Sequence, residues 1–276
     1  MQNQAGGVTA KMTIGSAAVQ GPLWGARAHD WSTLQESTFL PIYNAVLQRT
    51  GVGPGVGVLD VGCGAGLFLQ QAARLGARVT GLDAAQPLLD IAADRTPEGR
   101  FLQGDIEQLP FDDHIFDIVT GFNSFQYAAN RAHALAEARR VTRPGAPVVV
   151  AIWGSEEDCE AAGYIYALGR QLPPPPPGAP AAPSPFALSV PGALRALVES
   201  VGLTAGEEAD VACPWVFPDE ETALRALTSS GQAVRSINAT GESAVRAAIL
   251  EAIAPYRTAD GGYVLRNTFR YLVASA

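Results

Sequence analysis

The sequence predicts an α/β fold: a Rossmann-like, doubly wound sheet of seven mostly parallel strands, with an antiparallel last strand and helical lid or cap insertions. The first observation behind this prediction is a glycine-rich turn, residues 62–66, between an apolar run at 56–61 and a helical pattern at 67–75. A strand, such a turn and a helix in succession begin a nucleotide-binding βαβ unit. The second observation is that apolar runs and helical patterns keep alternating up to residue 154, as they do in parallel sheets.

The other elements follow from periodicity and from turn residues. Short apolar runs that end at glycine, asparagine or aspartate predict strands, and apolar residues that recur every three or four positions predict helices. The expected strands are 56–61, 78–82, 100–104, 116–122, 146–154, an irregular one at 203–217 and a last one at 263–273. The expected helices are 39–47, 67–75, 86–93, 132–141, 191–201, 220–228 and 242–253.

A length of 276 residues fits one enlarged domain. Residues 1 to about 20 are polar and glycine-rich, which favours a flexible segment. The run Pro173–Pro177 predicts extended polyproline, and residues 155–190 do not look like core. The expected parts are an N-terminal lid at 1–50, a nucleotide-binding core at 51–154, a proline-rich insertion at 155–190, and a C-terminal part at 191–276 with substrate-cap helices and the last strand.

Composition narrows the class of partner. The chain is 47% hydrophobic and 17% charged, with a net charge of -8, so it lacks the positive surface that binds nucleic acid or anionic membranes. Its three cysteines have no paired spacing, which favours a reducing compartment and predicts no metal site. No signal peptide or membrane-spanning run is apparent, so we expect a cytoplasmic protein with a small-molecule substrate. The oligomeric state stays open, with a homodimer as one option.

Acidic residues surround the predicted turn. Asp83 ends the second strand about 20 residues after the glycines, where a carboxylate accepts hydrogen bonds from ribose hydroxyls. Asp60 precedes the glycines, and an anion there would repel a pyrophosphate but favour a cationic ligand. Asp105 follows the third strand and could accept a hydrogen bond from an exocyclic amine, while Ile106 packs on a purine face. An adenosine-containing cation is therefore expected.

The segment Leu59–Gly66 resembles the first motif of the class I S-adenosylmethionine (SAM)-dependent methyltransferases of the small-molecule, UbiE-like type. Gly104–Phe111 resembles the adenine-binding motif of the same family, and the resemblance extends over residues 56–153. Ala146, where the family usually has glycine, is a mild departure. The resemblance implies SAM as cofactor, with S-adenosylhomocysteine as product, and a polar loop after the fourth strand near the methyl group. The expected cofactor-binding residues are Trp24, Arg27, Trp31, Asp60, Gly62, Cys63, Gly64, Gly66, Asp83, Ala84, Gly104, Asp105, Ile106, Phe122, Asn123, Ser124 and Gln126.

The sequence also predicts an N-terminal lid, which requires contact between segments that are far apart along the chain. Trp24 and Trp31 are seven residues apart, so they share one face if the segment is helical. We expect residues 20–35 to fold over the cofactor and to bring an indole ring near the sulfonium, because aromatic faces attract cations. The alternative is a helix that only packs its tryptophans on the core.

Methyl transfer from a sulfonium needs alignment, exclusion of water and, for some acceptors, a base. The candidate catalytic residues are His29 in the lid, His133 in the helix after the fourth strand, and Tyr127 beside the expected methyl position. His114 precedes the fourth strand, at the opposite end of the sheet, and is interpreted as a surface residue.

The predicted function is SAM-dependent methyl transfer to oxygen, nitrogen or carbon of a small organic acceptor, of the natural-product or other secondary-metabolite type. One alternative keeps the fold and SAM but catalyses a cyclisation or isomerisation without methyl transfer. A second alternative is an NAD-dependent oxidoreductase, which the glycine spacing, Asp60 and the Gly104–Ile106 segment disfavour.

Overall fold

The computed structural model of the chain describes residues 15–174 and 184–276. Its main sheet has seven strands in the order β3-β2-β1-β4-β5-β9-β6. All neighbouring strands from β3 to β5 are parallel, whereas β9 is antiparallel to both β5 and β6, which confirms the predicted fold class. The strands are β1 (Gly57–Val61), β2 (Arg78–Asp83), β3 (Arg100–Gln103), β4 (Ile118–Phe122), β5 (Pro147–Trp153), β6 (Thr204–Ala212) and β9 (Thr268–Ser275).

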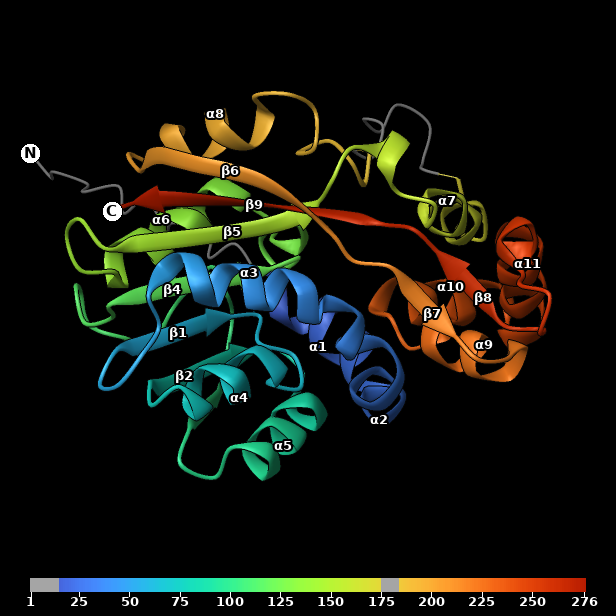
Figure 1. The fold of residues 1–276 in the computed structure, drawn as a ribbon, viewed down its shortest axis with the longest axis horizontal. Helices are drawn as coiled ribbons and strands as arrows, with labels where there is room; N and C mark the ends of the chain where they lie inside the picture. Colours follow the sequence, from blue (N-terminus) through green and yellow to red (C-terminus); the bar gives the residue numbers. More distant parts are fainter. Residues whose placement is uncertain (1–14, 175–183) are drawn as a thin grey trace, which may run out of the picture.

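Helices cover both faces of this sheet (Figure 1). One face carries α3 (Leu40–Thr50), α4 (Leu67–Arg74) and α5 (Gln86–Arg95), and the other carries α6 (Arg131–Val141) and α8 (Ala193–Ser200). The central strands are buried almost throughout, because helices on both faces leave no solvent side and so no alternation of polar residues. Short 3-10 turns follow β4 and β5, η3 (Phe125–Tyr127) and η4 (Glu156–Asp158).

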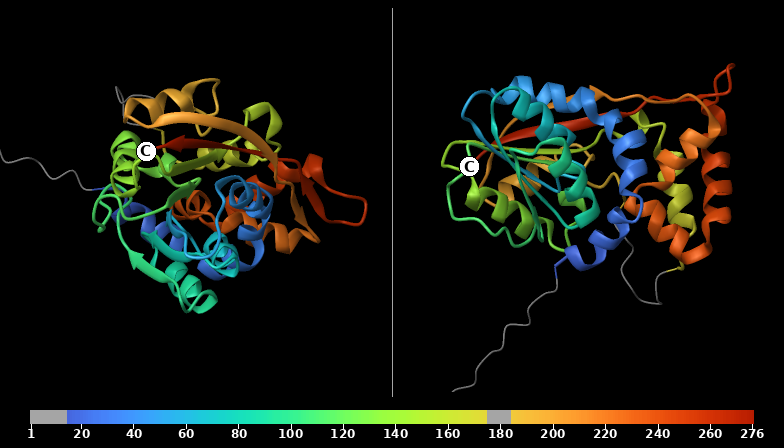
Figure 2. Two further views of the ribbon diagram at one scale, coloured as in Figure 1. Left: turned by 60° about the vertical axis from the view of Figure 1, so that its left-hand side comes forward. Right: turned by 90° about the horizontal axis from the view of Figure 1, so that it is seen from below.

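A group of helices lies beyond one edge of the α/β unit (Figures 1 and 2). It contains α7 (Ala162–Arg170), α9 (Glu220–Thr228), α10 (Gly231–Thr240), α11 (Glu242–Ile253) and η5 (Ala254–Tyr256), with the two-stranded pair β7 (Trp215–Phe217) and β8 (Tyr263–Leu265). We call this group the helical cap. The long strands β6 and β9 connect it to the main sheet.

The cap corrects three predictions. Residues 155–190 are not simply a surface insertion, because α7 buries Tyr164, Ile165 and Leu168 within the core shared with the sheet. Helix α10 was not expected, since its apolar positions are small or widely spaced. The expected strands at 203–217 and 263–273 each divide in two, because the chain leaves the main sheet there to form β7 and β8.

The N-terminal segment runs between the cap and the sheet. It forms α1 (Ala17–Gly25), α2 (Ala28–Asp30), a π-helical turn η1 (Trp31–Gln35) and a 3-10 turn η2 (Glu36–Phe39). Helix α1 contacts α5 on one side and α10 on the other (Figure 2). The flexible segment expected up to residue 20 is therefore wrong for its last residues, which are helical, while residues 1–14 and most of the proline run lie outside the described residues. No helix in the described ranges has the length and apolar character to cross a bilayer.

Candidate functional site

A pocket of about 830 Å³, including its open mouth, lies at the carboxyl ends of β1, β2, β3 and β4. Ligands of doubly wound sheets bind at this edge. Helix α1, η1 and η2 form the wall above the strand ends. We call it the cofactor pocket; its lining is Ser16, Ala17, Gln20, Trp24, Trp31, Glu36, Phe39, Tyr43, Asp60, Gly62, Cys63, Gly64, Asp83, Ala84, Leu88, Gly104, Ile106, Phe122, Asn123, Ser124 and Tyr127.

The glycine-rich turn forms the floor of the pocket. Gly62 has φ of +78°, and a Cβ there would lie 2.4 Å from the Cβ of Ser124, so only glycine fits. Asp83 organises the turn, since its Oδ2 accepts a hydrogen bond from the Gly64 amide at 2.9 Å and its Oδ1 accepts one from the Ala85 amide at 2.9 Å. Each oxygen keeps a lone pair, so a ribose hydroxyl remains a feasible second donor.

Three buried carboxylates line the cofactor pocket, and two of them, Asp60 and Asp83, have no cationic partner among the described residues. Burial raises the pKa of Asp60 to about 7, against a lowering hydrogen bond from the Thr120 hydroxyl at 2.7 Å and raising contributions from Asp83 and Glu36. Burial also raises the pKa of Asp83 and of Glu36. Charged forms are costly here until a cation neutralises them, so the pocket is suited to a positively charged ligand.

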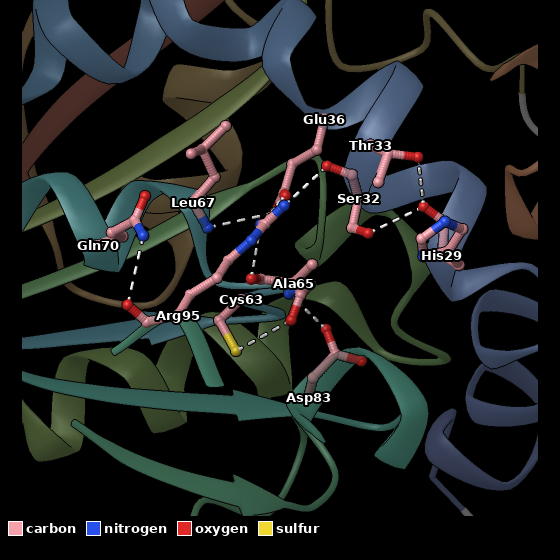
Figure 3. Close-up of polar contacts among 11 residues, drawn as sticks. His29, Ser32, Thr33, Glu36, Cys63, Ala65, Leu67, Gln70, Asp83 and Arg95 are labelled. Atoms are coloured by element: carbon pink, nitrogen blue, oxygen red, sulfur yellow. Dashed lines mark hydrogen bonds and ion pairs between the residues drawn. The ribbon is translucent and has the colours of Figure 1, made fainter. Parts of the chain in front are cut away.

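Arg95 of α5 ties the N-terminal segment to the glycine turn (Figure 3). It forms an ion pair with Glu36 and donates to the carbonyl oxygens of Ala65 at 2.8 Å and Ser32 at 2.7 Å. Glu36 in turn accepts from the Leu67 amide at 3.3 Å. Because Glu36 is only 2% exposed, this pair holds the wall of the pocket against its floor. We call it the Arg95–Glu36 clamp.

An aromatic cluster completes the wall. The rings of Trp24 and Trp31 meet edge to face with centroids 5.0 Å apart, and Trp24 also contacts Tyr127 at 5.6 Å. The two tryptophans do not share a continuous helix as expected, because the helix breaks between α1 and α2. They meet through that bend, and both line the pocket.

Two buried polar atoms without hydrogen-bond partners bear on whether the residues of the cofactor pocket fit SAM. The Oδ1 of Asn123 and the Oγ of Ser124 are buried without a hydrogen-bond partner among the described residues, although buried polar groups are normally paired. Asn123 also has φ of +51°, an uncommon conformation that a functional site can retain. Acceptors, carboxylates and aromatic faces suit the ammonium, hydroxyls and sulfonium of SAM, and we conclude that the pocket fits this cofactor. When bound, SAM supplies the reactive methyl group.

Several residues predicted to bind the cofactor lie outside the lining. Arg27 forms an ion pair at 2.9 Å with Glu242 of the helical cap, which already neutralises its charge. Gly66 immediately precedes α4, and a Cβ there would lie 2.7 Å from the Cβ of Ala92, so this glycine allows the helices to pack closely. Gln126 lines a neighbouring pocket instead.

Asp105 is also engaged elsewhere. Its Oδ2 accepts from the amide of Ala17 at 2.8 Å, and its Oδ1 accepts from the amide of Glu107 at 2.8 Å. The carboxylate therefore anchors the start of α1 in addition to forming a local turn. Asp105 is not part of the pocket lining, whereas Gly104 and Ile106 are. That it binds an exocyclic amine stays a prediction.

The candidate catalytic residues differ in their location relative to the two pockets. His29 and His133 are exposed and line neither pocket, so both predictions are corrected: His29 lies on the outer side of α2 and His133 in the first turn of α6. Tyr127 does line the pocket, and burial raises its pKa to about 12. It is therefore a hydrogen-bond donor at neutral pH. Burial raises the pKa of the Cys63 thiol as well, which keeps it protonated. His114 is exposed, as expected.

The sequence analysis missed part of the lining. The missed residues are Ser16, Ala17, Gln20, Glu36, Phe39, Tyr43 and Leu88. Six of these seven precede the first strand, in a segment with no motif. No group of three or more histidine, cysteine, aspartate or glutamate side chains in the described part of the chain is arranged to hold a metal ion.

Comparisons with known proteins agree with this geometry. Residues 59–150 match a family model described as a methyltransferase domain. The malonyl-[acyl-carrier protein] O-methyltransferase of Serratia marcescens is 40% identical over 116 residues, 42% of this chain and 43% of that protein. The enzyme of the same name from Erwinia pyrifoliae is 31% identical over 186 residues, 67% of this chain and 66% of that protein. The aligned part of the chain spans about half the length of these curated relatives.

Solved structures share the fold. A putative methyltransferase in complex with the Trm112 activator of Haloferax volcanii superposes with a TM-score of 0.58 at 23% identity, covering 95% of this chain and 97% of that one. The [4+2]-cyclase SpnF superposes with a TM-score of 0.52 at 21% identity, covering 83% of this chain and 79% of that one. The matched domain, the named relatives and the strand order show that the chain belongs to the class I SAM-dependent methyltransferase family.

Proposed function

We propose that this chain transfers the methyl group of SAM to an oxygen, nitrogen or carbon atom of a small organic acceptor, such as a secondary metabolite. The observation that carries the proposal is the cofactor pocket itself, in which three buried carboxylates and two unpaired acceptors, Asn123 and Ser124, meet an aromatic wall. These groups suit the sulfonium and the amino acid part of SAM.

The proposed acceptor site is a second pocket, which shares Gln20 and Tyr127 with the cofactor pocket. Its volume, including its open mouth, is about 690 Å³. The acidic net charge of -8 also disfavours nucleic acid as acceptor. We further propose that residues 1–50 act as the lid and residues 191–276 supply the substrate cap, as parts of one domain.

Protein residues have a limited role in this chemistry. The described pocket offers no histidine, and Tyr127 keeps its proton at neutral pH. The chain is therefore proposed to align the acceptor and exclude water, while the acceptor arrives with a nucleophile that needs no strong base.

Two measurements test the proposal. Thermal unfolding should shift upward with SAM and with S-adenosylhomocysteine but not with NAD, because a ligand that binds only the folded state stabilises it. Incubation of the protein and SAM with a mixture of small metabolites should yield a product heavier by one methylene group. A product of unchanged mass would instead support cyclisation or isomerisation, and a shift with NAD alone would contradict the cofactor assignment.

A further inference from the structure

The second pocket differs from the first in its charge. It lies between α1, the start of α6, the start of α10 and residues 184–185 of the loop that leads to α8. We call it the basic pocket. Its lining is Gln20, Leu23, Gln126, Tyr127, Arg131, Ser184, Pro185, Gly231, Gln232 and Arg235. Two arginines are the only charged side chains among these described residues.

Neither arginine is neutralised by a described residue. Arg131 donates through Nε to the backbone oxygen of Gln126 at 3.3 Å, and neither Arg131 nor Arg235 pairs with a carboxylate in the described ranges. By contrast, nearby Arg27 and Arg225 both pair with acidic residues. Two unpaired cations at one cavity create a local positive potential.

The backbone strengthens this potential. Arg131 is the first residue of α6 and Gly231 is the first residue of α10, so two helices of 11 and 10 residues begin at the basic pocket. Asn130 and Ser230 each cap one amide of these first turns, and Glu107 accepts from the two amides just before α6. The remaining first-turn amides and the helix dipoles carry partial positive charge, which favours anions. The amides of Gln20, Gln126 and Gln232 add further hydrogen-bond donors at the same cavity.

We infer that the basic pocket binds an anionic group of the acceptor, a carboxylate or a phosphate, through Arg131 and Arg235. The inference rests on the proposed function, because it takes the basic pocket as the acceptor site. The anion is a handle for recognition and is distinct from the atom that receives the methyl group. Tyr127 and Gln20 separate the handle from the cofactor pocket, so the acceptor spans both cavities.

The test measures anion recognition without any turnover. Calorimetry on the full chain compares three probes of similar shape, 2-naphthoate, 2-naphthyl phosphate and the neutral 2-naphthamide. The wild type should bind the charged probes more tightly than the amide, and added salt should reduce that preference. The double variant Arg131→Gln, Arg235→Gln should lose about three- to tenfold in affinity for the charged probes and retain its affinity for the amide.

A matched control separates a local effect from net charge. The double variant Arg74→Gln, Arg78→Gln removes two exposed arginines outside both pockets and should leave all three affinities unchanged. SAM affinity of the Arg131→Gln, Arg235→Gln variant should equal that of the wild type, which shows that the fold is intact. Preference for 2-naphthyl phosphate over 2-naphthoate would assign a phosphate handle, and the reverse a carboxylate.

The inference is wrong if the Arg131→Gln, Arg235→Gln variant keeps its preference for charged probes, or if the wild type has none. Failure of the proposed function looks different: SAM would not bind, or no product would gain a methylene group, while the probe affinities could still follow the expected pattern. The two results are therefore read from separate measurements.

Discussion

The two adjoining pockets are lined by side chains of opposite charge, and these side chains differ in burial and in how their charge is compensated. The cofactor pocket has Glu36, Asp60 and Asp83, each at most 9% exposed and fixed by backbone amides, a hydroxyl or an arginine. The basic pocket has Arg131, which is half-buried, and Arg235, which is exposed. Buried charge must be compensated by surrounding structure, whereas exposed charge is compensated by water.

Because the charged side chains differ in burial, substitutions in the two pockets should have different effects. Substitutions among the acids of the cofactor pocket should alter stability and cofactor binding together. Substitutions of Arg131 or Arg235 should alter acceptor binding alone, with stability changed by no more than about 0.5 kcal/mol. Acceptor preference could thus diverge without disturbing the cofactor site.

The largest expected effect comes from the Arg95–Glu36 clamp. Arg95→Gln should lower the free energy of unfolding by about 2–4 kcal/mol, because it leaves Glu36 buried without its partner. The value is set below that for a fully buried pair because Arg95 is 21% exposed. Urea unfolding measures it. The double variant Arg95→Gln, Glu36→Gln should recover part of the loss; an unchanged midpoint in the single variant would show that the clamp is not important for stability.

The next effect concerns cofactor affinity. Asp83→Ala should weaken SAM binding by about 1–3 kcal/mol, because the Gly64 and Ala85 amides and a ribose hydroxyl would lose their acceptor. Calorimetry on the folded variant measures the change, and Asp83→Asn, which keeps one acceptor oxygen, should lose less. Equal affinities for wild type and Asp83→Ala would remove Asp83 from the site.

A third prediction uses the titration of Asp60. Its pKa is about 7 in the folded chain and 3.8 as the reference value, so the folded state keeps the proton longer than the unfolded state. This group therefore lowers stability as pH rises from about 4 to about 7. This rise in the pKa corresponds to at most about 4 kcal/mol.

Asp60→Asn should reveal that contribution. The variant keeps an acceptor for the Thr120 hydroxyl but cannot ionise. Without SAM it should be more stable than the wild type at about pH 8, and the gap should close toward about pH 4. Thermal unfolding across pH measures it, and a gap that is constant with pH would show that Asp60 ionises without penalty.

The smallest effect concerns the aromatic wall. Trp24→Phe with Trp31→Phe keeps two rings, so SAM affinity should fall by less than about 1 kcal/mol. Fluorescence should change more clearly: SAM should alter the emission of the wild type, and the double variant should lose most of that response, since Trp153 and Trp215 lie in the core away from the pocket. A full response in the double variant would mean that the tryptophans only pack against each other.

The sequence predicted the parts of this protein that depend on neighbours along the chain. The strand before the glycines, the turn at Gly62 and Gly64, and Asp83 at the end of the next strand all obey local backbone rules, and all line the cofactor pocket. Their roles in binding SAM stay predictions. The long-range parts were missed: Glu36 and Arg95 are 59 positions apart, and no pattern in either segment announces the pair.

Candidate bases were the weakest part of the sequence analysis. His29 and His133 flank the site along the chain, but the side on which each points depends on how α2 and α6 rotate when they pack. Tyr127 lines the pocket, yet burial by surrounding elements raises its pKa and makes it a donor. The position of a residue along the chain indicates the region in which it lies. Whether it can act as a base depends on the orientation and burial of its side chain.

The sequence by itself determined the class of this protein, because hydrophobic periodicity and the steric demands of a glycine turn act over a few residues. It determined the α/β sheet, the edge at which a ligand binds and the acidic character of that edge. Only the tertiary structure decided that α7 and α10 join a cap, that Arg27 and Asp105 have other partners, and that Arg131 and Arg235 meet at one cavity. Those features come from contacts between distant segments, whose geometry is set by packing and burial in the folded chain.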